Sequence, residues 1–164
     1  MRRRSRLDLV AIAMLGLGLL ASGDVHAQQK SLKEQLVGTW TFVTSTDDRW
    51  GPNAKGVLVF DAHGRYVLVI NRADLPKFAS NRVDQGTAEE NQAVMKGTIA
   101  TFGTYSLNED DKTLTTQVEG GSFPNLYGRT QKRVIKALSP EELRYLNPAT
   151  TTGAAAEVVW KRAR

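Results

Sequence analysis

Eight apolar and β-branched runs of strand length, separated by turn-forming residues, organise this chain of 164 residues. The runs cover residues 36–46, 55–61, 65–71, 101–107, 113–120, 128–138, 142–147 and 155–163. Short connections alternate with longer ones: the short ones are 61–64, 108–112 and 139–141, and the longer ones are 47–54, 72–100, 121–127 and 148–154. Consecutive antiparallel strands place alternate connections at opposite ends of a sheet. The pattern therefore predicts an all-β fold, an eight-stranded antiparallel up-and-down β-barrel with one closed end and one mouth rimmed by loops.

One helix is predicted between the third and fourth strands. Thr87-Ala88-Glu89-Glu90 has the form of a capping box, in which the Thr87 hydroxyl accepts a hydrogen bond from the Glu90 amide and the Glu90 carboxylate accepts one from the Thr87 amide. We expect the helix to run from residue 88 to residue 95 or 97. It belongs to the longest connection, on the mouth side of the barrel.

Residues 1–27 have the pattern of an export signal. Four arginines precede an apolar stretch at 9–20, and Val25-His26-Ala27 offers small residues at the two positions that a signal peptidase reads. A membrane-spanning helix is the alternative, but it needs about 20 apolar residues, more than this stretch contains. We therefore expect cleavage after Ala27, a mature domain of residues 28–164 with no integral membrane span, and a periplasmic or secreted protein.

Charge and residue content disfavour several classes of function. Removal of residues 1–27 lowers the net charge from +5 to about +3, since four arginines and two aspartates are lost, and leaves no basic stripe for nucleic acid. The absence of cysteine excludes disulfides and thiolate metal sites. His63 is the one histidine after residue 27 and lies in a predicted hairpin turn. The sequence thus predicts no catalytic residue, no metal and no cofactor.

Strand counting brings two distant parts of the chain together. The first strand leads away from the closed end, and the last strand returns to it. Trp160 and Arg162 are therefore expected near Trp40. An arginine packed on a tryptophan ring is a stabilising cation–π contact, so we expect Arg162 to lie against Trp40.

Gly38-Thr39-Trp40 resembles the Gly-x-Trp pattern at the start of the first strand in lipocalins. Segments with a similar resemblance are 36–40, 51–56, 102–105, 118–125, Gly128 and 131–133. In this order they make the mature chain similar to the bacterial and fungal lipocalin-like domain family. The resemblance implies a calycin-type barrel with Trp40 plugging its closed end, and it implies little about the ligand. Thr116 and Gln117 stand where relatives often have histidines, so chemistry based on those histidines does not carry over.

The predicted sixth strand carries the main candidate for ligand binding. Gln131 and Arg133 share one face of this strand, and Lys132 and Lys136 share the other. Since lysines favour solvent, Gln131 and Arg133 are predicted to point into the barrel. A buried arginine costs several kcal/mol unless it is paired or hydrated, and its planar fork matches a carboxylate. We expect it to form an internal pair with Glu119 of the neighbouring strand or, as the alternative, to hold the acidic head group of a ligand.

Aromatic residues on the strands and in the mouth loops complete the set of candidates. The predicted ligand-binding residues are Arg133, Gln131, Tyr66, Tyr105, Tyr145, Glu119 and Phe123.

The sequence therefore predicts an exported barrel that binds a small hydrophobic or amphiphilic ligand in its interior, largely apolar and in one version acidic, reached past the helix. One alternative is an enzyme of isomerase or cyclase type acting on a hydrophobic substrate, with Tyr66, Tyr105, Glu119 and Arg133 as its candidates. A second alternative is an exported protein-interaction or inhibitor module. A filled interior with an apolar rim would favour the interaction module, and a cavity with polar groups would favour ligand binding or catalysis.

Overall fold

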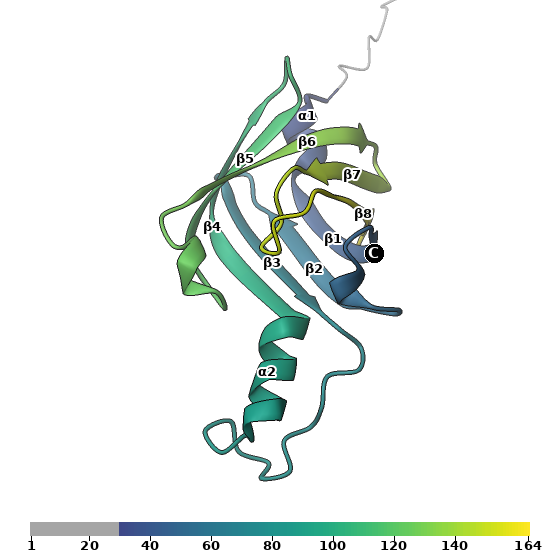
Figure 1. The fold of residues 1–164 in the computed structure, drawn as a ribbon. Helices are drawn as coiled ribbons and strands as arrows, with labels where there is room; N and C mark the ends of the chain where they lie inside the picture. Colours follow the sequence, from purple (N-terminus) through teal and green to yellow (C-terminus); the bar gives the residue numbers. More distant parts are fainter. Residues whose placement is uncertain (1–29) are drawn as a thin grey trace, which may run out of the picture.

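The fold, in a computed structural model that describes residues 30–164, is a closed barrel in which eight strands follow one another in sequence order, each antiparallel to the next (Figure 1). The strands are β1 (Gly38–Ser45), β2 (Lys55–Phe60), β3 (Arg65–Asn71), β4 (Thr98–Asn108), β5 (Thr113–Gly121), β6 (Thr130–Leu138), β7 (Glu142–Asn147) and β8 (Ala156–Arg162). Strand β8 pairs back onto β1 and closes the barrel. The predicted fold class is confirmed, and the predicted signal at 1–27 lies outside the described residues.

Two α-helices and two single 3₁₀ turns accompany the strands. They are α1 (Leu32–Leu36), α2 (Ala88–Gly97), η1 (Asp48–Trp50) and η2 (Pro124–Leu126). Helix α2 begins at the predicted capping box, of which both hydrogen bonds are present, and it projects from the barrel at the end opposite α1 (Figure 1). Among residues 30–164, no helix is long and apolar enough to cross a membrane.

The chain before β1 differs from the prediction. Residues 36 and 37 were expected to begin the first strand, but Leu36 ends helix α1. This helix has a capping box of its own, in which Ser31 accepts from the Glu34 amide and Glu34 accepts from the Ser31 amide. Its first two amides also donate to the carboxylate of Glu109 in the β4–β5 turn, which fixes α1 across the closed end.

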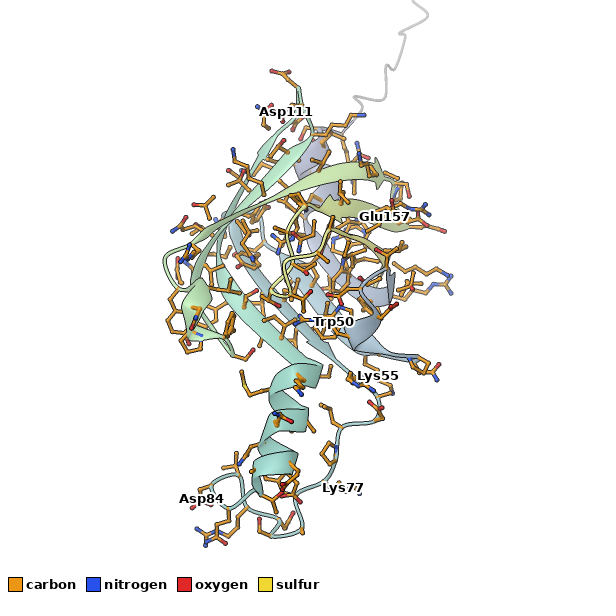
Figure 2. The ribbon with its side chains drawn as sticks, in the orientation of Figure 1. Trp50, Lys55, Lys77, Asp84, Asp111 and Glu157 are labelled. Atoms are coloured by element: carbon orange, nitrogen blue, oxygen red, sulfur yellow. The ribbon has the colours of Figure 1, made fainter. Side chains whose placement is uncertain are left out.

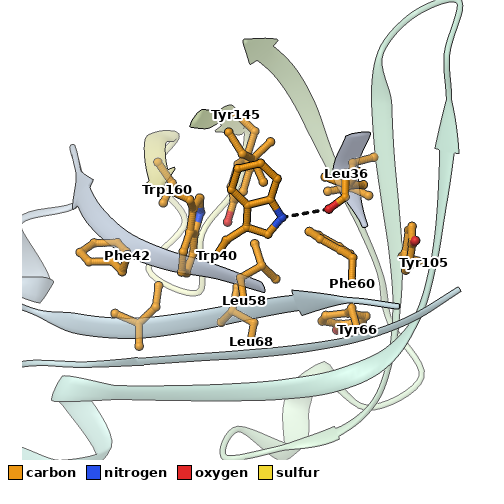
Figure 3. Packing of buried hydrophobic residues seen from close by; sticks show 14 of the residues in the cluster. Leu36, Trp40, Phe42, Leu58, Phe60, Tyr66, Leu68, Tyr105, Tyr145 and Trp160 are labelled. Atoms are coloured by element: carbon orange, nitrogen blue, oxygen red, sulfur yellow. Dashed lines mark hydrogen bonds between the residues drawn. The ribbon is translucent and has the colours of Figure 1, made fainter. Parts of the chain in front are cut away.

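Trp40 plugs that closed end. Its side chain is fully buried, and its indole N–H donates to the carbonyl of Leu36 at 2.9 Å (Figure 3). The Cζ atom of Arg162 lies 3.9 Å from the centroid of the Trp40 ring, and its Nη atoms donate to the carbonyls of Val37 and Gln35 at 2.7 and 2.5 Å. The predicted contact between Trp40 and Arg162 is confirmed.

Alternate side chains on each strand point inward and form the core. Its largest fully buried members include Trp40, Phe60, Leu114, Leu143 and Trp160, several of which are drawn in Figure 3. Three buried residues in the described chain are polar or charged: Thr101, Thr116 and Arg133. All three line spaces inside the barrel: Thr101 and Arg133 line one at the mouth, and Thr116 and Arg133 line a smaller one.

Candidate ligand-binding site

Strand β6 turns Gln131 and Arg133 into the barrel, as predicted. Arg133 is 6% exposed, whereas Lys132 and Lys136 are exposed on the outer face. Nη1 of Arg133 donates to Oγ1 of Thr116 at 2.9 Å, and Nη2 donates to Oε1 of Gln131 at 3.0 Å. Thr116 is paired with Gln131 across β5 and β6, so the strand register itself places both acceptors beside the guanidinium.

Both hydrogen-bond acceptors of Arg133 are neutral. Within residues 30–164, no carboxylate forms an ion pair with this guanidinium. A buried charge that is hydrogen-bonded only to neutral groups keeps much of its desolvation cost. The described chain thus leaves a positive charge inside the barrel without a negative partner.

The prediction of an internal ion pair between Arg133 and Glu119 is wrong. Glu119 lies on the outer face of β5, because Val118 and Gly120 are the inward residues of that stretch. Its carboxylate accepts two hydrogen bonds from Arg65, at 2.6 and 2.8 Å, and its side chain is 41% exposed. Glu119 therefore does not belong to the interior site.

Arg133 lines a cavity of about 60 Å³ that begins at the mouth of the barrel. Trp50 of η1 forms part of the cavity wall and lies near the middle of the view, well below the turn at the top that carries Asp111 (Figure 2). Polar and apolar side chains share the lining, including Gln131, Thr101, Tyr145, Leu68 and Ile70. Core side chains fill most of the barrel interior, and the small space that they leave at the mouth has both polar and apolar walls.

The connection between β1 and β2 supplies charged groups at the rim of this cavity. Arg49 stacks on the ring of Trp50 at 3.9 Å and donates to Oγ1 of Thr151 at 2.8 Å. Nε of Arg49 lies 3.5 Å from the carboxylate of Asp47, and burial lowers the pKa of Arg49 while Asp47 raises it. Arg49 thus has a nearby carboxylate in Asp47, whereas Arg133 forms no ion pair with a carboxylate of residues 30–164.

Tyr145 and Tyr66 lie on the inner wall. Tyr145 lines the mouth cavity, and its ring centroid lies 5.6 Å from Cζ of Arg133. Burial raises the pKa of the Tyr145 hydroxyl, although the charge of Arg133 opposes the shift. Tyr66 lies deeper and is 2% exposed. Both residues therefore belong to the same interior as Arg133.

Tyr105 is separated from this interior. It lies toward the closed end, where its hydroxyl donates to the carbonyl of Asp61 at 2.7 Å and its ring packs edge-on against Phe60. It lines neither the mouth cavity nor the space around Tyr66. The four candidates for catalysis thus do not form one site, since Tyr105 and Glu119 are apart from Tyr66 and Arg133.

Phe123 lies outside the barrel mouth, in a groove of about 200 Å³ beneath α2. Met95 and Gln92 of α2 form one side of the groove, and Ile99 of β4 lies at its base. Arg49, Ile99 and Thr151 line both the groove and the mouth cavity, so the two spaces adjoin at the rim.

Sequence reasoning missed the rim residues. Asp47, Arg49 and Thr151 come from connections, where no strand periodicity reveals the direction of a side chain. One signal was present: Asp47-Asp48-Arg49-Trp50 puts charges next to an aromatic residue in a mouth loop. Within residues 30–164, no group of three or more histidine, aspartate or glutamate side chains is placed to hold a metal ion.

The fold and this cavity define an up-and-down β-barrel with an internal polar site beneath a loop-rimmed mouth. The chain belongs to the family of lipocalin-like domains, whose model matches residues 35–163. A search of curated proteins gave no match.

Solved structures with a similar fold share little sequence with this chain. A lipocalin-like protein from Bacteroides uniformis has 13% identity and a TM-score of 0.41, over 79% of this chain and 99% of its own. A redesigned β-barrel has 15% identity and a TM-score of 0.46, over 83% and 98%. Bovine odorant binding protein, in complex with a selenium-containing odorant, has 17% identity and a TM-score of 0.39, over 83% and 74%.

Proposed function

We propose that the barrel binds a small amphiphilic acid, with the carboxylate at Arg133 and the apolar tail in the groove beneath α2. The observation that carries this proposal is the guanidinium of Arg133, which is buried, held by two neutral acceptors and matched by no carboxylate of residues 30–164. A carboxylate from a ligand would supply the missing charge and accept two parallel hydrogen bonds.

The volumes of the two spaces support this orientation. Pockets for drug-sized ligands measure roughly 300 to 1,000 Å³, whereas the mouth cavity measures about 60 Å³. It therefore accepts a head group rather than a whole ligand. The adjoining groove, of about 200 Å³ and lined by Met95, Ile99 and Phe123, offers apolar contacts for a tail.

Membership of the lipocalin-like family also supports ligand binding, because lipocalin barrels are wide enough to hold one small ligand. The polar groups of the mouth cavity favour a ligand over the interaction module, which a filled interior with an apolar rim would favour. For the enzyme, the separation of Tyr105 and Glu119 from Arg133 leaves fewer groups to perform acid-base chemistry.

A calorimetric titration with two matched probes tests the proposal. Octanoate and octanamide share a tail, but only octanoate carries a negative charge. We expect octanoate to bind more tightly by about 1.5 to 3 kcal/mol, the scale of a charge-assisted hydrogen bond. Equal affinities, or no binding of octanoate, would contradict the proposal.

We also propose that this binding takes place outside the cytoplasm. The proposal rests on the arginines, the apolar stretch and the cleavage pattern of residues 1–27. The intact mass of the protein from its own host checks it, since we expect a chain that begins at Gln28. A chain that retains residues 1–27 in a membrane fraction would contradict it.

A further inference from the structure

A second and much smaller space lies deeper in the barrel than the mouth cavity. It measures about 10 Å³, and Arg133 and Tyr145 line both spaces. Four apolar side chains of β2, β3 and β5 form most of its wall, and its other polar residues are Tyr66 and Thr116. We call this space the inner chamber.

The hydroxyl of Tyr66 is the unusual group of the inner chamber. The residue is 2% exposed, and no group of residues 30–164 forms a hydrogen bond with this hydroxyl. The hydroxyls of Tyr105 and Tyr127 both donate to backbone carbonyls, at 2.7 and 2.6 Å. A buried hydroxyl without a partner costs free energy that a phenylalanine would avoid, so the position of Tyr66 calls for a partner that residues 30–164 do not provide.

We propose that Tyr66 is a second hydrogen-bond donor to the carboxylate bound at Arg133. One carboxylate oxygen contacts the guanidinium of Arg133 and extends into the inner chamber, where it accepts a hydrogen bond from the Tyr66 hydroxyl. This inference rests on the proposed function and deepens it. It specifies a head group with an unhindered terminal acceptor oxygen, because a bulkier group at that end does not fit.

The size and surroundings of the inner chamber support this role. A volume of about 10 Å³ is close to the least that admits one water molecule, and hence one oxygen atom. The apolar wall keeps the local dielectric constant low, which strengthens a hydrogen bond made there.

Two tyrosine variants test the inference by calorimetry with octanoate and octanamide. We expect Tyr66→Phe to weaken octanoate binding by roughly tenfold or more, the effect of removing one hydrogen bond to a charged group, and to weaken octanamide binding less. Tyr105→Phe is the matched control, since it also removes one buried tyrosine hydroxyl, and we expect it to leave both affinities unchanged. Unchanged octanoate binding by Tyr66→Phe, together with loss of binding in Arg133→Met, would overturn this inference and leave the proposed function standing. Octanoate binding that neither variant alters would overturn both.

The stability of the ligand-free variants provides a second readout. Removal of a hydroxyl that has no protein partner is neutral or stabilising, so we expect Tyr66→Phe to melt at or above the temperature of the wild type. Tyr105→Phe is expected to melt at a lower temperature, since it loses the hydrogen bond to Asp61. A lower melting temperature for Tyr66→Phe would mean that its hydroxyl has a partner within the protein and would contradict the proposed role.

Discussion

Trp40 and Arg162 are directly opposite each other on β1 and β8, and the guanidinium carbon of Arg162 lies 3.9 Å from the indole centroid. The same guanidinium donates hydrogen bonds to the carbonyls of Gln35, Val37 and Pro140. One side chain therefore joins helix α1, the seam of the barrel and the β6–β7 turn. Burial lowers the pKa of Arg162, which is consistent with its partly enclosed position.

We predict that Arg162→Met destabilises the protein by about 3 kcal/mol. The methionine keeps an apolar stem over Trp40, but the three carbonyls lose a charged donor. Urea unfolding measures the change. Lys161→Met, at the neighbouring exposed position, is the control and is expected to stay within about 0.5 kcal/mol of the wild type. Equal stabilities of the two variants would show that Arg162 does not secure the closed end.

Gly38 allows Arg162 to reach this position. A Cβ atom at residue 38 would lie 2.5 Å from Nη1 of Arg162, and the backbone φ of +131° is one that other residues rarely adopt. We predict that Gly38→Ala costs about 1 to 3 kcal/mol. Gly128→Ala is the matched control, with a φ of +71° but open space around the added methyl group. If Gly38→Ala is no more destabilising than Gly128→Ala by urea unfolding, the contact with Arg162 does not restrict this position.

The alternation of side chains made much of the fold and part of the site predictable. In a strand, the direction of each side chain follows from its place in the sequence, so Lys132 and Lys136 on the outside imply Gln131 and Arg133 on the inside. The same rule would have placed Glu119 on the outer face, because its neighbour Val118 is an inward apolar residue. Strand alternation alone therefore argues against an internal pair between Glu119 and Arg133.

Other features were beyond the strand pattern. Residues 36 and 37 read as the start of a strand because both are apolar, yet the capping box of Ser31 and Glu34 makes the preceding segment helical. The rim group of Asp47 and Arg49 depends on how the β1–β2 connection folds back over the mouth, and side chains in a connection have no fixed period. The depth of Tyr66 and the size of the inner chamber depend on packing from several strands at once.

Tyr145 makes the stability of the protein sensitive to alkali. Burial raises the pKa of its hydroxyl above the ordinary value of 10.0, and the positive charge of Arg133 offsets only part of this shift. Above about pH 10 the unfolded chain therefore loses this proton while the native protein keeps it, so the native protein binds more protons and stability falls as pH rises. We predict that Tyr145→Phe loses less stability than the wild type between about pH 9 and pH 11. Urea unfolding across this range measures the difference, and identical pH profiles would contradict the prediction.

The unpaired charge of Arg133 is the central claim, and calorimetric titration of Arg133→Met with octanoate and octanamide tests it most directly. Methionine keeps an apolar stem of similar length and removes the charge and the donors. Arg65→Met is the matched control, because Arg65 lies on the outer face and is already paired with Glu119. We predict that Arg133→Met weakens octanoate binding by about 1.5 to 3 kcal/mol and leaves octanamide binding unchanged. We expect this variant to be no less stable than the wild type. Arg65→Met is expected to bind both probes as the wild type does. Arg133→Met that binds octanoate as tightly as Arg65→Met would contradict the assignment of Arg133 as the acid-binding residue.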